Sequence, residues 1–220
     1  GNDNIANGDY ALGNNTTGSN NTGTGYGALD FNSTGNNNTA NGRQALLHNT
    51  TGNNNVAVGA AALYYADGNS SNVAVGDSAL YTYSDFNYDD YMVAVGTRSL
   101  RNNTTGYYNT AIGGQAMVNN TIGVANTALG VYSLTSNASG SYNTAVGYTA
   151  NVSANNLTNA TAIGYGAIAT ASYQVKLGNS TVTSIGGYAN WTNFSDGRYK
   201  KNIKENVPGL DFINKLKPIT

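Results

Sequence analysis

The sequence predicts an all-β protein in which short parallel strands stack into a β-solenoid, or β-roll. The first observation is a column of glycines that recurs at a fixed spacing along most of the chain. The second is the alternation of polar and apolar residues before each glycine, as in "NTAIG" at 109–113, which is the pattern of a strand. The third is the run of Asn, Thr and Gly that closes each unit and supplies turn residues. We therefore expect about ten coils, one for each unit.

The glycine column has a period of 17 residues that is broken once, between Gly76 and Gly96, where the step is 20 residues. Its members are Gly8, Gly25, Gly42, Gly59, Gly76, Gly96, Gly113, Gly130, Gly147 and Gly164. Periods of this size are typical of solenoids, in which one unit cannot bury its own apolar face and stacking creates the core. At the usual strand spacing of about 4.8 Å, ten coils make a rod about 48 Å long.

Two further columns indicate which side chains face the core. The residue two positions before the glycine is Ala in nine of the ten units, with Gly23 as the exception, so a close neighbour must exclude larger side chains there. Four residues after the glycine stands a Leu or Met column that we also expect inside. Its members are Leu12, Leu29, Leu46, Leu63, Leu80, Leu100, Met117 and Leu134, followed by Asn151 as an exception and by Ile168.

The residue just before the glycine changes character along the chain. It is Asn7, Thr24 and Asn41 in the first three units and apolar in the later ones. The apolar members are Val58, Val75, Val95, Ile112, Leu129, Val146 and Ile163. Two explanations fit the polar start: stacked Asn side chains that hydrogen-bond as a ladder, or a face that is less buried near the N-terminus.

The composition excludes several classes of function. Only 10% of the residues are charged and the net charge is -1, which argues against nucleic acid or an anionic membrane as a partner. No apolar run approaches the length of a membrane span, and the lack of Cys excludes disulfides and thiolate metal sites. Glu205 is the only glutamate and His48 the only histidine, which leaves little for a glycosidase, a triad or a metal site. We expect no cofactor and no multiple-turnover enzyme, and the start at Gly1 suggests a segment of a longer protein.

The 20-residue unit contains "YTYSDFNYDDY" at 81–91, which we regard as a candidate ligand-binding loop. Tyrosines supply flat, rigid contact surface with a polar tip, which suits sugars or protein partners. An ordinary surface bulge is the simpler alternative. A calcium site is a third possibility, although the spacing of the three Asp matches no known ligand loop. The candidate residues are Tyr83, Asp85, Phe86, Tyr88, Asp89 and Asp90.

Units such as "NVAVGAAAL" at 55–63 and "NTALGVYSL" at 126–134 resemble the head repeats of trimeric autotransporter adhesins and similar repeats in phage tail fibres. The resemblance covers about residues 1–178, although 17 residues is longer than the usual adhesin repeat. It implies a left-handed parallel β-roll and a homotrimer, so that two further copies of the chain are the expected partners.

The C-terminal residues differ in charge and in pattern. Residues 1–175 carry three Arg against eight Asp, whereas the last 45 residues carry six Lys and one Arg against three acids. The segments "SDGRYKKNI" at 195–203 and "GLDFINKLKP" at 209–218 resemble the start of the intramolecular chaperone domain, also classed as an S74 peptidase domain, of endosialidases and many phage tail fibres. The matching residues of the first segment are Ser195, Asp196, Arg198, Lys200, Asn202 and Ile203.

This second resemblance implies a self-cleaving dyad in which Ser195 is the nucleophile and Lys200 is the base that removes its proton. The alternative is a plain turn followed by a solvated basic stretch. We expect three parts: a solenoid at 1–178, a connector at 179–194 and a truncated, mixed chaperone segment at 195–220. That segment includes one short helix with Leu210, Ile213 and Leu216 on one side.

The two resemblances together predict a structural or receptor-binding segment of a phage tail fibre or related virion appendage, located outside the cell. Nearly identical coils encode the register between chains poorly, because sliding by one unit preserves most contacts. A C-terminal trimerising chaperone would remove that ambiguity. The alternative is a bacterial cell-surface adhesin, and in either case the expected ligand is a host surface glycan or protein.

Overall fold

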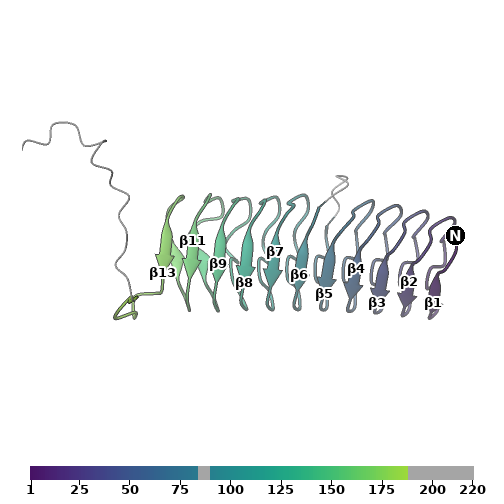
Figure 1. Ribbon diagram of the computed structural model, residues 1–220, viewed down its shortest axis with the longest axis horizontal. Coiled ribbons are helices and arrows are strands. Elements are labelled where there is room, and N and C mark those ends of the chain that lie inside the picture. Colours follow the sequence, from purple (N-terminus) through teal and green to yellow (C-terminus); the bar gives the residue numbers. More distant parts are fainter. Residues whose placement is uncertain (84–89, 188–220) are drawn as a thin grey trace, which may run out of the picture. The chain divides into compact units, whose positions relative to one another are not determined.

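The computed structural model describes residues 1–83 and 90–187 of the chain (Figure 1). The chain divides into two compact units, Gly1–Val182 and Thr183–Thr220. The first unit is all-β and forms a parallel β-solenoid, which confirms the predicted fold class. Residues 183–187 are the described part of the second unit and contain no strand.

Short strands, none longer than three residues, form the solenoid, and no helix occurs among the described residues. Eleven of them make one sheet in the order β1-β2-β3-β4-β5-β6-β7-β8-β9-β11-β13, and β10 and β12 make a second sheet. The bounds are β1 (Ile5–Asn7), β2 (Thr22–Thr24), β3 (Thr39–Asn41), β4 (Val56–Val58), β5 (Val73–Val75), β6 (Val93–Val95), β7 (Thr110–Ile112), β8 (Thr127–Leu129), β9 (Thr144–Val146), β10 (Asn151–Val152), β11 (Thr161–Ile163), β12 (Ile168–Ala169) and β13 (Val175–Leu177).

The register follows the sequence repeat. Ala57 of β4 lies beside Ala74 of β5, one 17-residue unit later, and Ala74 lies beside Ala94 across the 20-residue unit. The last step is shorter, because Ala162 of β11 lies beside Lys176 of β13. The successive strands therefore lie side by side along the rod in Figure 1, and β5 and β6 keep this pairing across the longer unit.

Both predicted core columns lie inside the solenoid. Ala6 is exposed and Leu12 is half-buried in the first coil, which has a neighbouring coil on one side only. From the second coil on, the members of both columns up to residue 145, and Ala162, are buried. Gly23 is buried, and the others all have 0% exposure. They are Ala40, Ala57, Ala74, Ala94, Ala111, Ala128, Ala145 and Ala162 of the first column, and Leu29, Leu46, Leu63, Leu80, Leu100, Met117 and Leu134 of the second.

The Leu column adopts a left-handed backbone rather than a strand. Leu46 has φ 49° and Leu63 has φ 51°, and their N–H groups donate to the carbonyl oxygens of Ala62 and Ala79 in the next coil at 3.0 and 2.9 Å. This conformation is costly for any residue with a side chain and worst for β-branched ones. It explains why the column contains Leu and Met but no Val or Ile up to Leu134. Burial of the whole side chain offsets the backbone strain.

The glycine column is required for two reasons. Gly59 has φ +129°, and a Cβ atom there would lie 2.6 Å from the carbonyl carbon and oxygen of Gly76 in the next coil. The same geometry recurs along the column, so the backbones of adjacent coils leave no room for a Cβ atom at these glycines.

The Leu column ends where the second sheet begins, which corrects one expectation. Asn151 and Ile168 occupy the next two positions of the column, but they pair with each other in β10 and β12. Ile168 is 46% exposed, and the following residues Val152 and Ala169 are buried in its place. A β-branched Ile resists the left-handed conformation of the column and favours a strand, in which alternate side chains point outward.

Candidate functional site

The outer face of the eleven-stranded sheet carries a row of apolar side chains, which we call the apolar stripe. Because residues alternate across a strand, the buried Ala of each strand is flanked by two side chains that point outward. The residues after the buried Ala include Val58, Ile112, Leu129 and Ile163, which are 36–46% exposed in the single chain. The full stripe is Val58, Val75, Val95, Ile112, Leu129, Val146 and Ile163. It crosses seven neighbouring strands.

The same column is polar in the first three coils. Asn7 and Asn41 are exposed and Thr24 is half-buried. No hydrogen bond joins these three side chains within the described residues, so the Asn ladder expected here does not form in the single chain. Lower burial does not explain the polar residues of the first three coils either, because apolar residues of the stripe such as Leu129 are also exposed.

A ladder of hydrogen-bonded Asn side chains does run through the solenoid, at the position just before each strand. The residue before most strands of the large sheet is a fully buried Asn, as at Asn21, Asn38 and Asn55. The backbone N–H of Asn38 donates to Oδ1 of Asn21 at 2.9 Å, and Nδ2 of Asn38 donates to the carbonyl oxygen of Gly52 at 2.7 Å. This first amide ladder comprises Asn4, Asn21, Asn38, Asn55, Asn72, Asn109, Asn126 and Asn143.

A second amide ladder lies in the turn that closes each coil. Nδ2 of Asn120 donates to Oδ1 of Asn103 at 2.6 Å, and Nδ2 of Asn137 donates to Oδ1 of Asn120 at 3.1 Å. The same pattern joins Asn15, Asn32 and Asn49 in the first three coils. Apart from Oδ1 of Asn49, these buried amides are satisfied by one another and by backbone carbonyls, which is what burial of polar groups requires. The 17-residue spacing of the Asn residues was the available sequence signal for both ladders.

Both ladders are interrupted near the 20-residue unit. Ala66 stands where the second ladder requires Asn, and Oδ1 of Asn49 has no hydrogen-bond partner among the described residues. In the next coil Tyr83 occupies that column and is fully buried. Met92 replaces Asn in the first ladder, where its Sδ accepts the N–H of Asn109 at 3.3 Å. Apolar packing therefore replaces amide hydrogen bonds at this point of the rod.

The candidate ligand loop lies at this interruption. Tyr83 and Asp90 at its base are both fully buried. The Asp90 carboxylate accepts hydrogen bonds from Nδ2 of Asn69 at 3.0 Å and of Asn72 at 3.5 Å, so these amides bind it from inside the coil. The other candidates, Asp85, Phe86, Tyr88 and Asp89, lie outside the described residues, and ligand binding by this loop stays a prediction. No group of three or more potential metal ligands occurs in the part of the chain that the structure describes.

An aromatic stack leads toward the same unit. The His48 ring lies parallel to Phe31 on one side, at 5.1 Å, and to Tyr65 on the other, at 5.2 Å. Tyr64 stacks on Tyr81 at 5.0 Å in the neighbouring column. Burial, with the nearby Tyr65 and Tyr64, raises the pKa of Tyr81 above its usual value of 10.0. The solitary histidine thus has a packing role between two aromatic rings.

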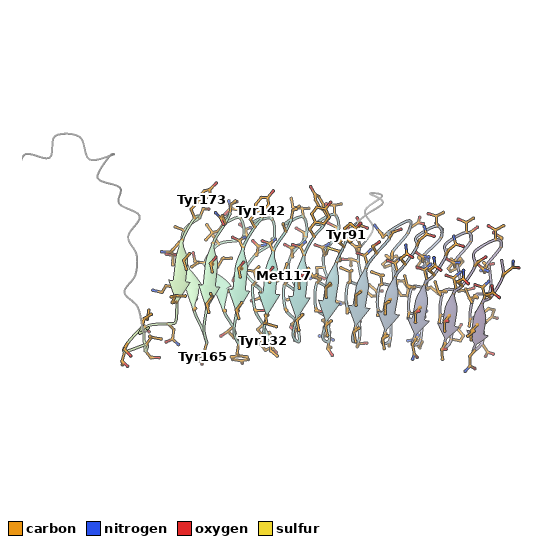
Figure 2. The ribbon with its side chains drawn as sticks, in the orientation of Figure 1. Tyr91, Met117, Tyr132, Tyr142, Tyr165 and Tyr173 are labelled. Carbon is orange, nitrogen blue, oxygen red and sulfur yellow. The ribbon has the colours of Figure 1, made fainter. Side chains whose placement is uncertain are left out.

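Exposed tyrosines occupy two opposite edges of the solenoid. Figure 2 shows Tyr91, Tyr142 and Tyr173 along one edge and Tyr132 and Tyr165 along the other. All five rings are 40–77% exposed. They are concentrated in the C-terminal half of the rod, where the described sequence has few charges. These edges are therefore candidate contact surfaces in addition to the apolar stripe.

The proposed cleavage dyad, Ser195 and Lys200, lies outside the described residues. The same holds for the expected short helix with Leu210, Ile213 and Leu216, so both stay predictions. Within the described residues, no helix is long and apolar enough to cross a membrane.

Comparison with known proteins does not assign the chain to a family. No protein-family model matches the sequence, and the search of curated proteins finds no matching relative.

Proposed function

We propose that this chain is a rod segment of a homotrimeric fibre, of the kind found in phage tail fibres and related virion appendages, and that it works outside the cell. The apolar stripe is the observation that carries the proposal. Four of its seven residues, Val58, Ile112, Leu129 and Ile163, are exposed in the single chain although they are apolar, and the other three are half-buried. Contiguous exposed apolar surface of this kind marks an interaction site.

The periodicity of the apolar stripe favours a second copy of the same chain as the partner. Its side chains repeat once per coil, at a spacing of about 4.8 Å along the rod. A partner with the same spacing places an apolar side chain against every residue of the apolar stripe. Another copy of this solenoid has that spacing because its coils are the same. The number three and the left-handed coil come from the resemblance of the repeats to adhesin heads and tail fibres.

The C-terminal segment supports the fibre proposal by its resemblance to an intramolecular chaperone. In this proposal the complete C-terminal domain trimerises, sets the register of the three rods and is then released by a single cleavage next to Ser195. The Lys200 amine takes the proton of the Ser195 hydroxyl, whose oxygen attacks the adjacent peptide carbonyl. The peptide C–N bond then breaks, the proton passes to the leaving amine, and water hydrolyses the resulting ester to release the two fragments. Ser195→Ala in the full-length protein should leave one intact product where the unmodified protein gives two. Equal processing of both proteins would contradict the dyad.

A bacterial surface adhesin is the second candidate, favoured by the adhesin-like repeats and by the exposed tyrosines. In that case the coils bind host or matrix ligands directly. The flanking sequences of the full-length gene discriminate the two: a virion-binding N-terminal domain supports the fibre, and a secretion signal with a membrane anchor supports the adhesin.

The oligomeric state is the direct test of the fibre proposal. Light scattering should give three times the 22.8 kDa of one chain. Leu129→Lys, on the apolar stripe, should lower this to one chain, because three lysines cannot be buried together without counter-charges. Ile122→Lys is the matched control, since Ile122 is 53% exposed but lies outside the stripe, and it should leave the trimer intact. A monomeric wild-type protein, or equal effects of the two variants, would contradict the proposed interface.

A further inference from the structure

One surface column of the solenoid carries tyrosines that its backbone does not favour. The column consists of the residue that precedes each member of the first amide ladder, together with the residues at the same position in the coils that lack a ladder Asn. The backbone of these residues is left-handed in every coil, with φ between 44° and 63°. In the first five coils the column reads Asp3, Asn20, Asn37, Asn54 and Ser71. In the last six it reads Tyr91, Tyr108, Ala125, Tyr142, Asn159 and Tyr173.

The left-handed backbone is unfavourable for tyrosine, and burial of the rings does not offset this strain. Asn and Asp are the non-glycine residues best suited to the left-handed region, whereas bulky residues there are outliers. In the Leu column the same strain is offset by complete burial, but Tyr142 is 61% exposed and Tyr173 is 77% exposed. The backbone of the coil is held without the rings, because the N–H of Tyr142 donates to Val124 O at 2.9 Å and that of Tyr173 donates to Thr158 O at 3.0 Å. Folding alone therefore does not account for four tyrosines in this column.

The rings form a regular row along one edge of the rod. Tyr91 and Tyr108 are on adjacent coils, with ring centroids 6.1 Å apart. Tyr108, Tyr142 and Tyr173 then follow at intervals of two coils, or about 9.6 Å. Tyr91, Tyr142 and Tyr173 project from the same edge in Figure 2. We call these four residues the tyrosine row.

The sequence around the tyrosine row has few charges and many hydroxyl groups. From Tyr91 to Tyr173 the sequence contains two Arg and no Asp or Glu. Ser141, just before Tyr142, accepts the N–H of Val124 at 3.1 Å, and Ser172, just before Tyr173, accepts the N–H of Thr158 at 3.0 Å. Each serine is thereby oriented while its own O–H can still donate to an acceptor outside the coil.

We propose that the tyrosine row binds a linear, uncharged polysaccharide that lies along the edge of the rod. Aromatic rings present an apolar face to the C–H face of a sugar, and their hydroxyl tips, with Ser141 and Ser172, hydrogen-bond its hydroxyls. The two-coil interval corresponds to about two sugar units of an extended chain, so every second sugar meets a ring. The inference rests on the proposed host-binding fibre for its biological setting, and names the ligand class and the surface that binds it.

The binding test uses the complete chain and an array of uncharged and charged linear polysaccharides, followed by calorimetry with a length series of the best uncharged binder. At least one uncharged glycan should bind, and affinity should rise in steps as the oligosaccharide becomes long enough to span two and then three tyrosines. Tyr142→Ala, in the middle of the row, should weaken binding at least tenfold. Tyr132→Ala, on the opposite edge, should change it less than twofold. Binding of charged glycans alone, no binding on the array, or equal effects of the two variants would overturn the proposal.

A second measurement tests the strain argument without a ligand. Tyr142→Asn introduces the residue that the column carries in Asn20, Asn37 and Asn54, and should raise the melting temperature by one or more degrees while abolishing the contribution of this site to glycan binding. A lower melting temperature would show that the ring serves the fold, and would overturn the proposal. A loss of the oligomer in Tyr142→Ala would do the same by placing the ring at a subunit contact. Failure of glycan binding with an intact trimer leaves the fibre proposal standing, so the two are distinguishable.

Discussion

The buried amides of the second ladder offer a quantitative test of what holds the coils together. Asn120→Ala removes the middle member of the triplet that joins Asn103, Asn120 and Asn137. The change leaves Oδ1 of Asn103, which is fully buried, without the donor that now lies at 2.6 Å. The other partners are less affected. Gly123 O still accepts from Asn109 at 2.7 Å, and Asn137 still donates to Gly140 O at 2.9 Å.

The expected cost follows from counting these groups. One buried carbonyl oxygen without a donor costs about 1–3 kcal/mol, and the lost hydrogen bonds add about 1 kcal/mol. Asn120→Ala should therefore lower the free energy of unfolding by roughly 2–4 kcal/mol, which corresponds to a drop in melting temperature of about 4–16 °C in a unit of this size.

Asn49→Ala is the matched comparison. It also leaves one buried oxygen without a donor, that of Asn32, whose partner now lies at 2.8 Å. However, it removes the Asn49 oxygen that already has no partner among the described residues. Its cost should be smaller by about 1–3 kcal/mol. Calorimetric scans at equal protein concentration measure both variants, because the melting temperature of an oligomer depends on concentration. An Asn120→Ala variant no less stable than Asn49→Ala would refute the reasoning.

Two further comparisons test the backbone of the coil. Gly113→Ala places a Cβ 2.5 Å from the carbonyl group of Gly130 at φ +134° and should cost more than about 3 kcal/mol or prevent folding. A Cβ at Gly114 would make only an ordinary contact, 4.0 Å from Cγ1 of Val131, so Gly114→Ala should stay within about 0.5 kcal/mol of the parent protein in thermal denaturation. Similar losses for the two variants would contradict the close approach. Leu63→Met should cost less than about 1.5 kcal/mol, as Met117 already fills the equivalent position. Leu63→Ile should cost clearly more despite its similar volume, because φ is 51°, and equal melting temperatures of the two Leu63 variants would show that the left-handed backbone does not select the residue.

The coil length, strand positions and core columns are predictable because each is a strictly periodic property of the sequence. A column such as Ala57 and Ala74 is informative without any structure, since a repeat that tolerates only Ala must face a close neighbour. The end of the Leu column is less predictable. Asn151 and Ile168 keep the spacing but change the backbone, and β13 arrives after a shorter step. Periodicity identifies a position, whereas the conformation there depends on which residue occupies it.

The amide ladders show a second limit of prediction from sequence. The Asn before each strand, such as Asn38, was visible as a repeated letter, yet Asn is common in turns and the surface is the usual place for it. Only the stacking of identical coils provides a partner for each buried amide, because the donor comes from one coil and the acceptor from the next. The Asn ladder considered as one explanation for Asn7 and Asn41 occurs instead on other columns, for the same reason. The sequence of a single repeat does not indicate which of its polar side chains will find hydrogen-bond partners in the neighbouring coils.

This solenoid buries amides beside its apolar core and leaves part of its apolar surface exposed. Amides such as Asn38 and Asn120 are buried and hydrogen-bonded, whereas Val58, Ile112 and Leu129 face outward. Burial of the amides requires neither a partner chain nor water, since the ladders satisfy them within one chain. Burial of the outer apolar side chains requires something beyond that chain. In the proposed fibre, burial of the apolar stripe stabilises the association of rods side by side. The polar start at Asn7, Thr24 and Asn41 then makes a one-coil slip costly, because it brings Asn41 against Val58 of the next rod. In a fibre of this kind, part of the register is thus encoded in the rod itself.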